Sequence, residues 1–167
     1  DAATNLGPVV NKAQFERVQG YIKIGLDEGA TLLCGGPGRP QGLDKGFFIR
    51  PTIFADVTPG MTIAREEIFG PVLVVMSYAS EAQAVEIANG TPYGLGGYVF
   101  SSDRNKAHAI GAQMRAGRIF FNGAPSNYVA PMGGYKQSGN GREMGVFGLE
   151  EYLEVKSMIG FDAPASA

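Results

Sequence analysis

Residues 72–90, VLVVMSYASEAQAVEIANG, join an apolar run to a segment with clear signals for the start and the end of a helix. The run from Val72 to Tyr78 opens with five apolar residues, which is typical of a buried strand. Ser80 begins a capping box, and Gly90 follows the last residue with a helical pattern. This stretch therefore predicts one strand followed directly by one helix.

The same order of elements is repeated further along the chain. Tyr98 to Ser101 predicts a strand, a helix capped by Asp103 follows, and Arg118 to Phe121 predicts another strand. The order βαβαβ implies parallel neighbouring strands joined by right-handed connections. We therefore predict an α/β fold with at least three strands of a parallel sheet.

The sequence before this region predicts one helix and two strands. Asn11 to Gly29 has apolar residues on one helical face and a capping-box start, and Thr31 to Cys34 predicts a short strand. Phe47 to Phe54 is strand-like, but Pro51 lacks a backbone donor, so we expect this strand at a sheet edge or a bulge.

The end of the sequence alternates in the manner of a strand from Glu151 to Gly160. The predicted organisation is therefore one domain over residues 1–150, a strand over residues 151–160 and a flexible tail over residues 161–167.

Composition excludes several classes of function. The chain has 167 residues, of which 44% are hydrophobic, and 14 basic residues against 16 acidic ones form no cluster that would favour nucleic acid or an anionic membrane. One cysteine and one histidine exclude an internal disulfide and a typical zinc site. The longest apolar run is far shorter than the ~20 residues of a membrane helix, and no export signal is visible, so a cytoplasmic location is expected.

Three features with possible chemistry have ordinary interpretations. The segment GGYKQSGNGRE, residues 133–143, fits neither glycine-rich phosphate-loop pattern and is interpreted as a tight connection within the loop 122–145. Cys34 lacks a histidine or a basic residue nearby in sequence and is interpreted as structural. His108 lies beside an apolar helical stripe, which favours a packing or surface role.

The segment REEIFGPVLVV, residues 65–75, places two glutamates beside large apolar residues and a Gly-Pro turn. Glu66 and Glu67 could be solvated charges at a turn. A carboxylate can also accept two hydrogen bonds from a vicinal diol, and an aromatic ring such as that of Phe69 can pack on a planar heterocycle. A ribose that carries a nicotinamide has both features.

These motifs carry a resemblance to a known family. EEIFGPVL (66–73), GFFIRPTIFADV (46–57) and GGYKQSGNGREMGVFGLEEYLEVKSM (133–158) resemble the C-terminal third of the NAD(P)-dependent aldehyde dehydrogenase superfamily. The resemblance extends over nearly the whole chain, beginning at LGPVVNKAQFERVQGYI (6–22). It implies part of a catalytic domain in an oxidoreductase that converts an aldehyde to a carboxylic acid with NAD or NADP.

The resemblance also implies roles for individual residues. It assigns the nicotinamide ribose to Glu67 and the nicotinamide ring to Phe69, and it places Tyr128 and Met132 in the wall of the aldehyde tunnel. Many relatives carry phenylalanine where this chain has Met132, so a preference for aromatic substrates is not implied. The strand from Tyr152 to Ile159 is expected to join a sheet with a neighbouring subunit and so to form a homo-oligomer.

The catalytic cysteine and glutamate of the superfamily belong to segments that the resemblance places upstream of this sequence. We therefore expect the chain to have no catalytic residue of its own and to be inactive alone. It could be a piece of a longer enzyme, a chain that complements a separate N-terminal part, or a non-enzymatic assembly module. Its opening, DAATNLGPVV, resembles sequence from the middle of a domain, which favours the first reading. The aldehyde and the choice between NAD and NADP are left open.

Overall fold

The computed structural model describes residues 4–160. The chain forms two compact units, Asp1–Pro92 and Tyr93–Ala167. None of the helices between residues 4 and 160 combines the length and the apolar character that are needed to cross a bilayer.

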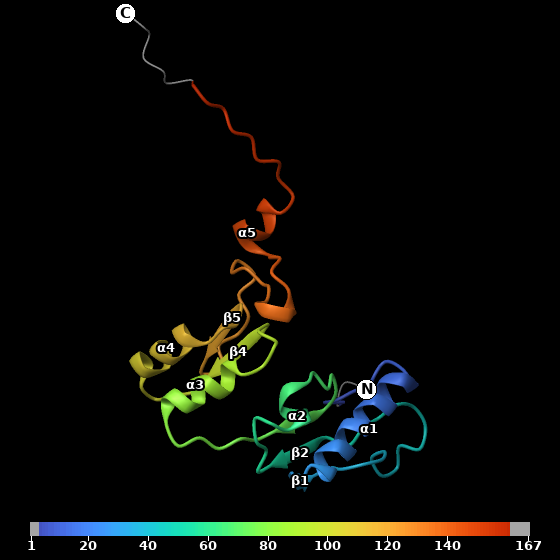
Figure 1. Ribbon diagram of the computed structural model, residues 1–167. Helices are drawn as coiled ribbons and strands as arrows, with labels where there is room; N and C mark the ends of the chain where they lie inside the picture. Colours follow the sequence, from blue (N-terminus) through green and yellow to red (C-terminus); the bar gives the residue numbers. More distant parts are fainter. Residues whose placement is uncertain (1–3, 161–167) are drawn as a thin grey trace, which may run out of the picture. The chain divides into compact units, whose positions relative to one another are not determined.

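The first unit packs helices against a three-stranded mixed sheet (Figure 1). Its elements are α1 (Lys12–Asp27), β1 (Thr31–Cys34), β2 (Thr52–Ala55), α2 (Thr62–Arg65), β3 (Val72–Val74) and α3 (Glu81–Asn89). The strand order is β1-β2-β3, in which β1 is antiparallel to β2 and β3 is parallel to it. The strand β2 is therefore the centre of this sheet.

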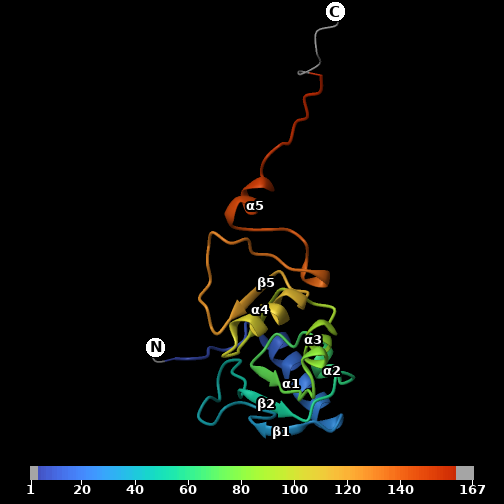
Figure 2. The same cartoon turned by 90° about the vertical axis from the view of Figure 1, so that its left-hand side faces the viewer.

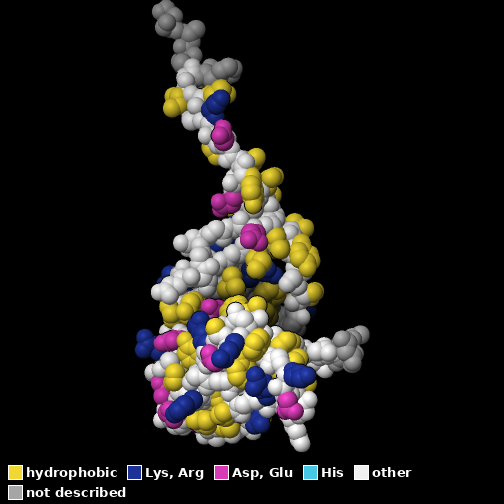
Figure 3. All heavy atoms as spheres, turned by 90° about the vertical axis from the view of Figure 1, so that its right-hand side faces the viewer, with side chains coloured by type: hydrophobic (Ala, Val, Ile, Leu, Met, Phe, Trp, Pro, Cys, Tyr) yellow, Lys and Arg dark blue, Asp and Glu magenta, His cyan; other side chains and the backbone are white. Residues whose placement is uncertain are grey.

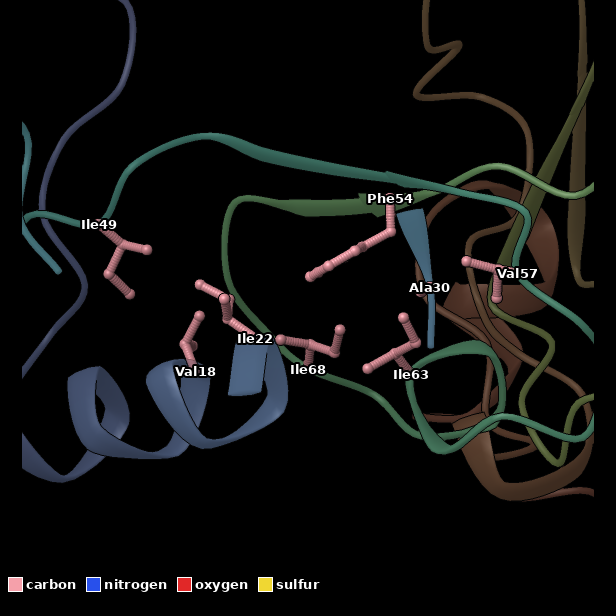
Figure 4. Close-up of a cluster of buried hydrophobic side chains, with 8 residues drawn as sticks. All are labelled: Val18, Ile22, Ala30, Ile49, Phe54, Val57, Ile63 and Ile68. Carbon is pink, nitrogen blue, oxygen red and sulfur yellow. The ribbon is translucent and has the colours of Figure 1, made fainter. Parts of the chain in front are cut away.

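The core of the first unit lies between α1 and the sheet. Val18 and Ile22 on α1 and Phe54 on β2 are fully buried, and Ile63 of α2 and Ile68 join the same cluster (Figure 4). Each fully buried side chain of this size contributes about 1.5–3 kcal/mol, so this contact fixes α1 on the sheet.

Local signals placed α1 and α3 correctly, whereas α2 was not predicted. The Asn11 side chain accepts a hydrogen bond from the backbone N–H of Gln14 at 2.9 Å, which is the predicted cap of α1. Ser80 caps α3 through the N–H of Gln83 at 3.2 Å, and the Gln83 side chain accepts from the N–H of Ala79. The predicted starts of both helices are thus confirmed.

The expectation for Pro51 was wrong. The strand β2 begins one residue later, at Thr52, so the proline removes no donor from the sheet and the strand can lie at its centre. The Thr52 N–H donates to the carbonyl of Pro71 at 2.9 Å. The irregular pairing lies on the other strand, between Leu32 and Cys34 of β1.

The second unit contains a βαβ crossover. Its elements are β4 (Gly96–Val99), α4 (Arg104–Gln113), β5 (Arg118–Phe121), a short 3₁₀ helix η1 (Lys136–Ser138) and α5 (Gly145–Glu150). The strands β4 and β5 are parallel, and α4 contacts both of them (Figure 2). The predicted cap is confirmed, because Asp103 Oδ1 accepts from the N–H groups of Asn105 and Lys106.

The α/β class and the parallel neighbouring strands are confirmed, whereas neither unit by itself contains three parallel strands. The parallel pairs are β2 with β3 and β4 with β5, and they belong to two separate sheets. The strand β3 also ends at Val74, short of the predicted Tyr78. It pairs with β2, which precedes it by about twenty residues, and this long-range pairing leaves no mark in the local pattern.

The predicted strand from Glu151 to Gly160 is not formed. Residues 152–160 have neither helix nor strand, and the side chains of Val155 and Ile159 are 97% and 95% exposed. Hydrophobic side chains lie along the surface of this segment (Figure 3). A strand needs a partner for its backbone groups, and no described strand pairs with this segment. The predicted tail, residues 161–167, lies outside the described residues.

We expect Phe54→Ala to lower the free energy of unfolding of the first unit by about 3–5 kcal/mol, because it leaves a cavity at the centre of the core. Urea unfolding followed by circular dichroism measures this change. Leu33→Ala is the control, because Leu33 on β1 is 60% exposed and its truncation should cost less than about 1 kcal/mol. Equal losses in the two variants would contradict the assignment of the core.

Candidate functional site

The residues predicted to hold the cofactor lie on residues 66–71, which we call the site loop and which connect α2 to β3. Ile68 is 8% exposed and packs in the core near Ile22, whereas its neighbours Glu67 and Phe69 are exposed (Figure 4). One buried side chain therefore anchors the loop and leaves a carboxylate and an aromatic ring on its outer side.

Phe69 has an unusual backbone conformation. Its φ is +58°, in the left-handed region, and its ring is 72% exposed. This conformation is uncommon for a bulky residue and persists only where the surrounding structure holds it. The backbone of Phe69 is therefore strained, and other contacts must stabilise the conformation that exposes its ring.

The helix α1 supplies this support through side-chain hydrogen bonds. The Gln14 side-chain amide Nε2 donates to the carbonyls of Phe69 at 2.8 Å and Ile68 at 3.3 Å. The Arg17 guanidinium donates to the carbonyl of Glu67 at 2.8 Å. Three consecutive carbonyls of the site loop therefore accept hydrogen bonds from one helix.

The site loop passes close to α1 at Gly70, where its backbone lies against the side chain of Val18. A Cβ atom on Gly70 would lie 2.6 Å from Cγ2 of Val18, which is too close for any side chain. The carbonyl of the next residue, Pro71, accepts from the N–H of Thr52 on β2. Glycine at this position lets the chain pass α1 and enter the sheet.

The two adjacent glutamates have different surroundings. The Glu66 carboxylate accepts a hydrogen bond from the Tyr21 hydroxyl at 2.7 Å. Arg17 binds the backbone carbonyl of Glu67 and does not contact its carboxylate. The Glu67 carboxylate has no hydrogen-bond or ion-pair partner within residues 4–160. Of the two, the second glutamate therefore has the carboxylate whose acceptor sites are all open, and this fits the recognition of a ribose diol.

The predicted tunnel residues lie in the second unit. Tyr128 is 75% exposed on the connection after β5. Met132 is half-buried and forms a two-residue antiparallel bridge with Glu143, with both N···O distances at 2.7 Å. Met132 also lines a pocket of about 400 Å³ with Leu95, Arg142 and Tyr152, and Tyr128 is not part of that lining. The two predicted pairs belong to different units.

The glycine-rich segment 133–143 is a tight connection. Arg142 Nη1 donates to the carbonyls of Gly134, Asn140 and Gly141 at 2.9–3.0 Å. The Ser138 hydroxyl accepts from the N–H of Gly94 at 3.0 Å, which ties the segment to the start of β4. The guanidinium thus serves to close the loop.

The remaining candidates form no catalytic arrangement. Cys34 is exposed at the end of β1, and its sulfur contacts the carbonyl of Pro51 at 3.9 Å. His108 stacks on Phe121 with ring centroids 6.4 Å apart, which agrees with the predicted packing role. Within the described part of the chain, no group of three or more His, Cys, Asp or Glu side chains could hold a metal ion.

The sequence analysis missed the three residues of α1 that contact the site loop. Gln14, Arg17 and Tyr21 are spaced by three and four residues and so lie on one face of the helix. A polar row beside the apolar row of Val18 and Ile22 was the available signal. Nothing in the sequence indicates that its partner is a loop some fifty residues away.

Comparisons with known proteins identify the family. The aldehyde dehydrogenase family profile matches residues 1–158. The chain therefore belongs to the aldehyde dehydrogenase family.

Several relatives are close in sequence and structure. The 3-succinoylsemialdehyde-pyridine dehydrogenase of a Pseudomonas species is 52% identical over 159 residues, which are 95% of this chain and 33% of that protein. Aldehyde dehydrogenase C of Pseudomonas syringae, solved with NAD+ and octanal, is 54% identical with a TM-score of 0.94, covering 98% of this chain and 34% of that one. An aldehyde dehydrogenase of Mycobacterium tuberculosis solved with NAD+ is 51% identical with a TM-score of 0.88, covering 91% and 31%. The chain thus spans about a third of the length of these relatives.

Proposed function

We propose that this chain is the C-terminal part of an NAD(P)-dependent aldehyde dehydrogenase and supplies the contacts to the nicotinamide riboside. The observation that carries the proposal is the contrast between the two glutamates, since the Glu66 carboxylate is bonded to Tyr21 and that of Glu67 is open. The exposed ring of Phe69 adds an apolar surface for a planar heterocycle. The NAD+ in the solved relatives supports this choice of ligand and favours NAD over NADP.

The role of these residues is to position the cofactor. When bound, the nicotinamide ring accepts the hydride that leaves the substrate carbon. The Glu67 carboxylate can accept hydrogen bonds from both ribose hydroxyls, which fixes the rotation of the sugar. The Phe69 ring limits the movement of the heterocycle. Position decides the rate of such a transfer, because the reacting atoms must stay close and aligned.

We propose that Tyr128 and Met132 contribute to the wall of the aldehyde tunnel. The backbone of Met132 is held by its bridge to Glu143, and Met132 is one of the residues that line the pocket. A thioether adapts to ligands of different shape, and it therefore suits aliphatic substrates as well as aromatic ones.

We further propose that residues 152–159 form the contact with a second copy of the chain. The exposed side chains of Tyr152, Val155 and Ile159 support this assignment. Strand exchange between two copies would satisfy the backbone groups of both and form a closed dimer.

The chain alone should show no NAD(P)-dependent oxidation of aldehydes, because it lacks a positioned nucleophile. Cofactor reduction is followed by absorbance with aliphatic and aromatic aldehydes, and Cys34→Ser serves as the control. Turnover that disappears with Cys34→Ser would show that the exposed thiol is a nucleophile and would refute the prediction.

The cofactor contact can be tested in a chimaera in which this chain replaces the matching third of the P. syringae enzyme. Glu67→Gln should raise the KM for NAD+ by about 5- to 150-fold, which corresponds to about 1–3 kcal/mol for a hydrogen bond to a charged group. Glu66→Gln is the matched control and should have a smaller effect, because that carboxylate is bonded to Tyr21. Equal effects of the two substitutions would show that the assignment to Glu67 is wrong.

Light scattering of the chain at micromolar concentration should detect an oligomer. Val155→Pro should lower the oligomeric state or leave the protein insoluble, because proline removes a backbone donor from the predicted strand. Val155→Thr keeps that donor and should behave as the unchanged chain does. A monodisperse monomer in the unchanged chain would refute the proposed contact.

A further inference from the structure

We propose that Gln14 is a positioning residue that holds Phe69 in its left-handed conformation and so sets the direction of the ring. The proposal rests on the proposed function of the site loop as the contact for the nicotinamide riboside. It assigns a role in that function to a residue of α1 that precedes the loop by more than fifty positions.

The geometry of the Gln14 amide carries the proposal. One atom, Nε2, donates to the carbonyls of both Ile68 and Phe69. In an extended chain, consecutive carbonyls point to opposite sides, so a single nitrogen cannot reach both. The two carbonyls converge here because Phe69, with its φ of +58°, turns the chain between them. The amide therefore binds the turned conformation and would lose a partner if the loop became extended.

The interaction is of the right strength for this role. The left-handed conformation is unfavourable for a bulky residue by an amount similar to the net gain of one or two hydrogen bonds. The bonds from Gln14 can therefore offset the strain at Phe69. Without them, the extended conformations of the loop become competitive and the ring loses its fixed direction.

Neighbouring contacts restrict the loop on both sides of this turn. Arg17 holds the preceding carbonyl, that of Glu67, and Gly70 lies against Val18 immediately after the turn. The residues before and after Phe69 are thus fixed to the same helix. The backbone dihedral angles of Phe69 are then the ones that can still change, and the bonds from Gln14 restrict them.

The chain offers a matched control on the same helix. The Gln19 side chain also bonds to a distant loop, since its Oε1 accepts from the N–H of Gly38 at 2.6 Å. That loop precedes β2 and does not belong to the site. Gln19→Met removes the same kind of side-chain amide from α1 and leaves the contacts of Phe69 intact.

The first measurement is independent of ligand. Gln14→Met keeps the length and the apolar stem of the side chain but removes both donors. Nuclear magnetic resonance relaxation of the amides of residues 67–70 should show order parameters falling from about 0.85 toward about 0.6 or below. Gln19→Met should leave them unchanged, and Gln14→Lys, which keeps a donor, should restore most of the order.

The second measurement tests the consequence for binding. Nicotinamide mononucleotide is titrated into the chimaera described above, because binding by this chain alone is not expected, and calorimetry reports its dissociation constant. We expect Gln14→Met to raise this constant about tenfold and Gln19→Met to change it less than twofold. If Gln14→Met retains both the order parameters and the affinity, the positioning role is refuted. If the chimaera with the unchanged chain does not bind the mononucleotide, the proposed function of the loop is refuted, while the order parameters still decide the role of Gln14.

Discussion

The packing of α1 against the mixed sheet is the interaction on which the site depends. Val18 and Ile22 meet Phe54 in a fully buried cluster, and this contact fixes one face of the helix. The same placement brings the polar row of Gln14, Arg17 and Tyr21 into contact with the site loop. Val18 has a second function, because its methyl groups define how closely Gly70 can pass. The core and the loop geometry are thus two results of the same helix placement.

Two neighbouring glutamates show how the fold engages one carboxylate and leaves the next one open. Both are exposed and identical in chemistry, so neither composition nor charge distinguishes them. Tyr21 engages the first, and Arg17 engages only the backbone of the second. The supporting helix therefore leaves one carboxylate open by satisfying the other, and the buried Ile68 between the open carboxylate and Phe69 keeps both side chains on the outside.

Local sequence signals predicted α1, α3 and α4 but neither the short helices nor the partners of the strands. The caps at Asn11, Ser80 and Asp103 involve residues two or three positions apart, and each was correctly predicted. The pairing of β2 with β3 and the bonds from Gln14 join residues far apart in sequence, and only tertiary packing determines them. The family motifs identified Glu67 and Phe69 as candidates, but they gave no indication of the strained turn or of its support from α1.

Ile68 belongs both to the site loop and to the core, and it therefore links the loop to the thermal stability of the first unit. Because this side chain belongs to the core, the loop cannot leave its place without opening the cluster around Val18 and Ile22. A dinucleotide that binds only the ordered loop would therefore raise the melting temperature of this unit by mass action. In the reverse direction, a core mutation that opens this cluster would also release the loop. Ligand affinity and heat resistance are in this sense one property of the fold.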